Sequence, residues 1–148
     1  MSYKDQLRDI VQRYRKAGEK WPASSHEIAA WALFNKLWAP QHEDMLDQCA
    51  DQLADAMRED YVTDPQGRRV RAKHAAREGQ SVLWADIRDA SREHMSVAFA
   101  QRRQQIVGDC RQLKADVDSF NDNRSVKNPI QMSFDFTLDL LELELVKN

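Results

Sequence analysis

The chain has 148 residues, of which 42% are hydrophobic and 31% are charged, and its formal net charge is −2. This length fits one domain of about 100–150 residues, so we expect a single domain over residues 1–148 with enough apolar surface for a core. The hydrophobic fraction excludes wholesale disorder. With four glycines and four prolines, the composition favours helices over loops.

The N-terminal residues, the hydropathy and the cysteines indicate where in the cell the protein is expected. Residues 1–5 lack the apolar run of a secretory signal, and no stretch reaches the roughly 18 apolar residues of a membrane helix. Cys49 and Cys110 occupy apolar positions of helical patterns, which is typical of buried free thiols rather than a disulfide scaffold. We therefore expect a cytoplasmic protein with no membrane contact.

Charges are segregated along the chain. Residues 41–60 contain seven acids and one base, whereas residues 61–80 contain five bases and two acids. Residues 101–114 are basic again, and the last twenty residues are acidic. Such blocks are compatible with internal pairing, with dimer formation, or with an anionic partner for the basic blocks.

Three helices are predicted in the first 60 residues. The first runs from Tyr3 to Tyr14 and stops near Gly18. The second begins at Ser24 or Ser25 with a capping box, ends at Ala39–Pro40, and is apolar on more than half its circumference. We expect it to be the centre of a core rich in tryptophan, including Trp31 and Trp38. The third runs through residues 45–57, with a narrow apolar stripe opposite its acids.

A hairpin and a long helical region follow. Asp64-Pro65-Gln66-Gly67 has turn chemistry and predicts a β-hairpin near residues 61–72. We expect residues 81–120 to form a long helical arm, either one helix or two helices divided near Gly108. Apolar and polar residues then alternate over 130–140, within a C-terminal tail at 130–146, which predicts a strand paired with the hairpin or with a second copy. The expected fold class is α+β, predominantly helical, with four or five helices.

No catalytic constellation is visible in the sequence. The histidines at 26, 42, 74 and 94 lack metal-ligand spacing, and neither cysteine has a neighbour that would complete a zinc site. We interpret residues 42–44 as a helix start with favourable first-turn acids, and Glu93–His94 as structural. Asp135, Asp139 and Glu142 are candidate ligands of a divalent ion, but protection of a strand edge is the favoured interpretation. We therefore expect no enzyme activity, cofactor or metal.

The most informative stretch is the hairpin with its basic continuation. Its candidate nucleic-acid-binding residues are Arg68, Arg69, Arg71, Lys73, His74 and Arg77. In a strand, Arg69 and Arg71 share one face, from which two guanidiniums at the lip of a turn can reach phosphate oxygens. The competing interpretation is that these bases neutralise the acidic third helix or the acidic C-terminal strand.

The order of these elements resembles a winged helix-turn-helix domain over residues 24–74. A capped helix, a second helix and a hairpin follow one another, as in that family, whose second helix enters the major groove while the hairpin contacts the backbone. The resemblance is one of layout. The helix in the recognition position is acidic here, including Asp47 and Asp51, so any DNA contact is expected from the basic hairpin.

Two functional hypotheses follow, from different classes. The first is a non-enzymatic nucleic-acid-binding or regulatory module that contacts double-stranded DNA through the hairpin and dimerises through the long helix. The alternative is a protein-interaction or scaffold protein that dimerises through the long helix and the C-terminal strand and binds no nucleic acid. An enzyme is a third option, which would need a carboxylate site such as Asp135 and Asp139 with a distant histidine.

Overall fold

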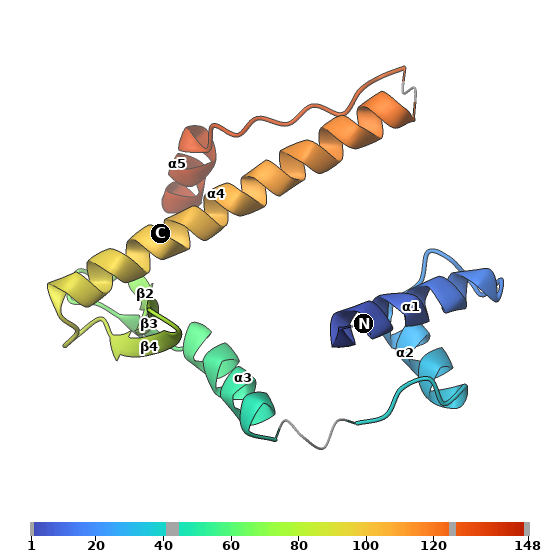
Figure 1. Ribbon diagram of the computed structural model, residues 1–148. Helices are drawn as coiled ribbons and strands as arrows, with labels where there is room; N and C mark the ends of the chain where they lie inside the picture. The colour runs from blue at the N-terminus through green and yellow to red at the C-terminus, as the bar shows by residue number, and fades with distance from the viewer. Residues whose placement is uncertain (1, 41–44, 125–126, 147–148) are drawn as a thin grey trace. The chain divides into compact units, whose positions relative to one another are not determined.

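The computed structural model describes residues 2–40, 45–124 and 127–146. These residues form five helices and four short strands (Figure 1). The fold class is therefore α+β and mostly helical, as predicted. The chain divides into two compact units, Met1–Asp51 and Gln52–Asn148, and each is described by itself.

The first unit contains helices α1 (Tyr3–Lys16) and α2 (Ser25–Phe34). The Ser24 hydroxyl accepts a hydrogen bond from the Glu27 N–H at 3.0 Å, which confirms the predicted start of α2. Tyr14 is the buried centre of this unit, with 3% of its surface exposed. Its ring meets Trp31 edge-on with centroids 5.5 Å apart, and its hydroxyl donates to the Lys20 carbonyl at 2.8 Å.

Helix α2 is shorter than predicted and is not the centre of a core. It ends at Phe34 rather than at Ala39, because Lys36 adopts a left-handed φ of 56°. The Leu37 N–H then bonds to the Ala32 carbonyl and the Lys36 N–H to the Leu33 carbonyl, which is a Schellman termination. Phe34 is 86% exposed and Ala32 is the buried residue of the helix, so the predicted tryptophan-rich core is wrong.

Helix α3 (Met45–Arg58) confirms the third predicted helix. Its apolar stripe is exposed, however, with Leu46 at 83% and Leu53 at 58%. Cys49 is exposed as well, and Cys110 is only partly buried, so the prediction of buried thiols is wrong. The interpretation of residues 42–44 as a helix start lies outside the described residues.

The predicted hairpin near residues 61–72 is confirmed. Strand β1 (Tyr61–Thr63) pairs antiparallel with β2 (Arg69–Arg71), and Val62 lies opposite Val70. The Asp64 carboxylate accepts the backbone N–H of Gln66 at 3.0 Å and that of Arg68 at 2.7 Å, which fixes the turn. Its last position is occupied by Gly67.

A second hairpin follows directly and was not predicted. Strand β3 (Lys73–Glu78) pairs antiparallel with β4 (Ser81–Asp86), so the helical arm predicted from residue 81 begins too early. Ala72 alone separates the two hairpins and is fully buried. Its N–H donates to the Asp60 carbonyl, and its own carbonyl accepts the Ile87 N–H, both at 2.8 Å.

Helix α4 (Arg92–Asn123) is one helix, which settles the choice between one helix and two. Its 32 residues correspond to about 48 Å at 1.5 Å per residue. The Ser91 hydroxyl caps its first turn, and the helix continues through Gly108. Ala98 and Phe99 in its first half lie against β3, where the Phe99 ring meets His74 edge-on at 5.4 Å.

The predicted C-terminal strand over residues 130–140 is wrong. Residues 129–136 carry no regular secondary structure, and residues 137–146 form helix α5 (Thr137–Val146). Leu and Glu, which favour helices, make up most of this stretch, and the described part of the chain offers no strand that pairs with the alternating segment. No helix among the described residues is long and apolar enough to cross a membrane.

Candidate functional site

Two of the six predicted contact residues are engaged in ion pairs within their own unit. The Arg68 Nε lies 2.7 Å from the Asp64 carboxylate. The Lys73 ammonium lies 3.0 Å from a carboxylate oxygen of Asp60 and 3.1 Å from one of Asp86, and the two hydrogen bonds raise the Lys73 pKa. These two cations stabilise the hairpins, and their charge is already compensated.

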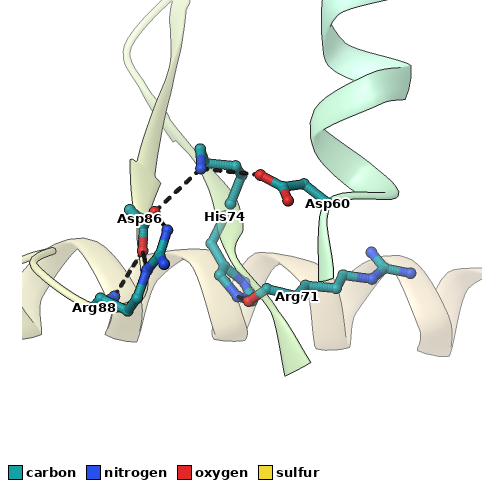
Figure 2. A network of polar contacts seen from close by, with 6 residues as sticks. Asp60, Arg71, His74, Asp86 and Arg88 are labelled. Atoms are coloured by element: carbon teal, nitrogen blue, oxygen red, sulfur yellow. Dashed lines mark hydrogen bonds and ion pairs between the residues drawn. The ribbon is translucent and has the colours of Figure 1, made fainter. Parts of the chain in front are cut away.

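The carboxylate of Asp86 links the Lys73 cluster to the loop that precedes α4. It lies 2.7 Å from an amino group of the Arg88 guanidinium, and it accepts the Arg88 backbone N–H as well. These bonds hold the Asp86 pKa well below its usual range. In Figure 2, the side chain of Arg71 extends away from Asp86 and Arg88.

His74 is buried, with 7% of its surface exposed. Its Nε2 lies 2.8 Å from the Arg71 carbonyl and must carry the proton, because a carbonyl only accepts. The His94 Nε2 donates in the same way to the His74 carbonyl at 2.8 Å. Both histidines therefore connect backbone segments, which agrees with the structural role expected for His94.

The remaining predicted residues are Arg69, Arg71 and Arg77. The Arg69 guanidinium lies 4.4 Å from the centre of the Tyr61 ring, a cation–π contact across the first hairpin. Arg71 is half-buried, and Arg77 is exposed. Neither Arg71 nor Arg77 has an acidic side chain in ion-pair contact within the described residues.

Arg71 and Arg77 line a cleft of about 670 Å³ between β3, β4 and α4, which we call the basic cleft. The Gln101 side chain fixes α4 to β3 at its edge, since it accepts the Arg77 N–H at 2.8 Å and donates to the Arg77 carbonyl at 3.0 Å. The basic residues lining the cleft are Arg58, Arg71, Lys73, Arg77 and Arg102, and Asp109 is an acidic one. Its apolar walls include Val82, Trp84 and Ile106.

A smaller hollow of about 390 Å³ adjoins the first hairpin and shares Arg71, His74 and Arg102 with the basic cleft. Arg71 and Arg102 therefore face both spaces. Partial burial, followed by the nearby positive charge of Arg71, lowers the pKa of the Arg102 guanidinium. Two neighbouring cations without a carboxylate between them form an arrangement that an anion would stabilise.

Arg102 and Arg58 belong to the site but were not predicted. The sequence did contain a signal for Arg102, because Arg102 and Arg103 interrupt the apolar stripe of the long helix. The sequence contained no such signal for Arg58, which is the last residue of the acidic helix α3 and forms an ion pair with Asp55 at 2.8 Å. Its guanidinium also lies 5.7 Å from the Trp84 ring.

The candidate metal ligands at the C-terminal end are not brought together. Among the residues that the structure describes, no group of three or more His, Cys, Asp or Glu side chains is placed to hold a metal ion. The Asp135 carboxylate instead accepts the Thr137 N–H at 3.1 Å and its hydroxyl at 2.8 Å, immediately before α5. Asp139 lies in the first turn of that helix, so the two aspartates do not share a strand face.

Comparison of the chain with known protein families, curated proteins and solved structures gave no match.

Proposed function

We propose that the protein is a nucleic-acid-binding module whose basic cleft contacts phosphate groups through Arg71, Arg77 and Arg102. The observation that carries this proposal is the pair formed by Arg71 and Arg102. These guanidiniums line both hollows, the positive charge of Arg71 acts on Arg102, and neither has an acidic partner in ion-pair contact within the described residues. A phosphate oxygen supplies the missing negative charge, and guanidiniums bind phosphate in a bidentate manner.

The proposal keeps the basic hairpin predicted from the sequence but assigns its residues to different tasks. Arg68 and Lys73 are structural cations with carboxylate partners, whereas Arg71 of β2, Arg77 of β3 and Arg102 of α4 provide the charge for a ligand. The element order of α2, α3 and the first hairpin is consistent with a winged-helix-like layout of residues 24–74, which belongs to the same proposal. Double-stranded DNA is the proposed partner.

The test is fluorescence anisotropy of a labelled random DNA duplex at about 50 and 200 mM salt. If the three arginines each neutralise one phosphate, the affinity should fall roughly 40-fold between these concentrations, because the slope is about −0.9 per phosphate contact. The double variant Arg71→Gln/Arg102→Gln should flatten the slope by about 1.8.

The matched control removes two exposed arginines from α1, in the variant Arg8→Gln/Arg13→Gln. These arginines form ion pairs within their own helix, with Asp5 and Asp9, so their loss lowers the net charge equally but leaves the basic cleft intact. Equal loss of affinity in the two double variants would show that binding follows net charge and not the cleft, and would contradict the proposal.

A scaffold function is the second candidate, supported by exposed apolar side chains of α4 between residues 106 and 120. Ile106, Leu113 and Phe120 are 52%, 43% and 41% exposed and share a heptad pattern. A dimer formed by these residues should dissociate in the variant Leu113→Glu, as measured by sedimentation equilibrium. A monomeric wild-type chain would contradict this function.

A further inference from the structure

The basic cleft has an aromatic wall, the indole ring of Trp84. Trp84 lies in β4 on the same face of the second hairpin as Val82, because alternate residues of a strand share a face, and both line the cleft. The residue opposite Trp84 in β3 is Ala75, whose methyl group covers little of a neighbouring ring. Trp84 is half-buried, so part of its side chain is accessible from the cleft.

A planar cation lies loosely over this ring. The Arg58 guanidinium is 5.7 Å from the centre of the Trp84 ring, whereas carbon atoms in van der Waals contact are about 3.5–4.0 Å apart. Arg58 and its ion-pair partner Asp55 are both exposed, and exposed ion pairs contribute little to stability. A flat aromatic group that stacks directly on Trp84 can therefore displace the Arg58 guanidinium.

Helix α4 supplies the opposite wall with groups in a fixed order. Arg102, Gln105, Ile106 and Asp109 follow one another at spacings of three, one and three residues, so they share one face of the helix. The Gln105 amide forms no hydrogen bond with another described residue, and it offers the donor and the acceptor that recognise the edge of a base. Asp109, about two turns beyond Arg102, repels phosphate, so the anionic end of a ligand belongs at Arg102.

These features match the two ends of a nucleotide. Arg71 and Arg102 provide cations that have no carboxylate in ion-pair contact within the described residues, and Trp84 provides a surface on which a base can stack. Proteins that bind single strands combine a positively charged groove with aromatic side chains in this way. In a duplex, each base is paired and stacked between its neighbours, so its face is not available to Trp84.

We infer that the basic cleft receives an unpaired nucleotide of a DNA strand, with its base stacked on Trp84 and its phosphate at Arg71 and Arg102. The Gln105 amide hydrogen-bonds the edge of this base. The protein therefore binds DNA that contains unpaired nucleotides more tightly than fully paired DNA. The inference rests on the proposed phosphate contacts of the cleft and adds the form of DNA that the cleft selects.

The test compares two labelled DNAs by fluorescence anisotropy with the full-length protein. One is a blunt duplex, and the other is the same duplex with about eight unpaired thymidines inserted in one strand, which is within the site sizes of single-strand binders. The DNA with unpaired thymidines should bind about tenfold more tightly, because one stacked base changes the affinity by roughly 5- to 150-fold. Equal affinity for the two DNAs would overturn the inference.

Variants of the aromatic wall test the assignment to Trp84. Trp84→Leu should remove the preference for unpaired thymidines and leave binding to the blunt duplex unchanged, whereas Trp84→Phe keeps a ring and should keep most of the preference. Trp21→Leu is the matched control, because Trp21 is 46% exposed in the first unit, and it should bind both DNAs as the wild type does. Circular dichroism checks that each variant is folded. A folded Trp84→Leu variant that keeps the preference would overturn the inference.

Tryptophan emission gives an independent measurement. A base stacked on an indole ring quenches its fluorescence, so a single-stranded oligothymidine should quench part of the emission from the four tryptophans. In Trp84→Phe this quenching should disappear although the oligothymidine still binds. Quenching that persists in Trp84→Phe would place the base on another tryptophan and overturn the inference.

A free nucleotide is the other source of the same base and phosphate. Thymidine monophosphate should displace the labelled oligothymidine only at far higher concentration, because a single nucleotide makes fewer phosphate contacts than a strand. Displacement by thymidine monophosphate at a concentration similar to that of unlabelled oligothymidine would assign the cleft to a free nucleotide and overturn the strand assignment.

The inference and the proposed function fail in distinguishable ways. If the blunt duplex binds through Arg71 and Arg102 but unpaired thymidines add nothing, the inference falls and the proposed function stands. If unpaired DNA binds through Trp84 and the two arginines but the blunt duplex does not bind, the inference stands and double-stranded DNA is the wrong partner. If Arg71→Gln/Arg102→Gln leaves the affinity for both DNAs unchanged, both proposals fall.

Discussion

Replacement of the buried His74 by alanine should destabilise the second unit by about 2–4 kcal/mol. The change removes the Nε2–H bond to the Arg71 carbonyl, which contributes about 1 kcal/mol. It also removes the edge-to-face contact with Phe99, which contributes about 0.5–1.5 kcal/mol more. In addition, it leaves a cavity beneath α4 that the surrounding structure fills only in part. Urea unfolding followed by circular dichroism at neutral pH measures the sum.

Two further variants separate these contributions. His74→Phe keeps a ring against Phe99 but loses the donor, so its cost should be about 1 kcal/mol. His26→Ala is the matched control, because His26 is exposed in the first unit and surface substitutions usually change stability by within about 0.5 kcal/mol. If His74→Ala costs no more than His26→Ala, the reasoning from burial and hydrogen bonding is refuted.

Three other outcomes are expected. Lys36→Gly should stabilise the first unit by about 0.5–1 kcal/mol, because glycine adopts the left-handed φ of 56° without steric cost; an unchanged or lower melting temperature would contradict it. Hydrogen bonds from Arg68 and Arg88 lower the pKa values of Asp64 and Asp86, respectively, in the folded protein. The stability that these two carboxylates contribute is therefore fully present above pH about 4 and is lost as the pH falls further. Asp64→Asn should therefore flatten the fall in melting temperature under acid, and a parallel curve would count against it. Lys73→Met should lower the urea midpoint more than Arg8→Met, which removes only an exposed pair.

Part of the fold could be predicted from the sequence because helix caps and turns depend on residues close together in the chain. Ser24 and Glu27 stand at capping distance, and Asp64 and Gly67 have the side chain and backbone freedom that their turn needs. The second hairpin was missed because β3 is composed mainly of Lys, Ala, Arg and Glu, residues that favour helices. Its strand conformation depends on pairing with β4 and on contact with α4, which sequence periodicity does not report.

The candidate site was predictable only as a basic stretch. Which cations are free depends on partners distant in sequence, and both carboxylates that bind Lys73 lie thirteen residues from it. Asp86 ends a strand that the sequence did not predict, so its pairing could not be anticipated. Arg102 comes from a separate helix, and its position beside Arg71 results from the packing of α4 on β3.

The buried junction at Ala72 determines where this chain tolerates insertions. Its N–H and carbonyl belong to the hydrogen bonding of both hairpins, so one added residue there would separate Asp60 from Lys73 and turn each side chain of β3 to the opposite face. The two turns, at Gly67 and Gly79, are exposed, and lengthening a loop costs little, about 0.6 kcal/mol per doubling. Reporter peptides and linkers therefore belong in these turns, where both hairpins keep their register.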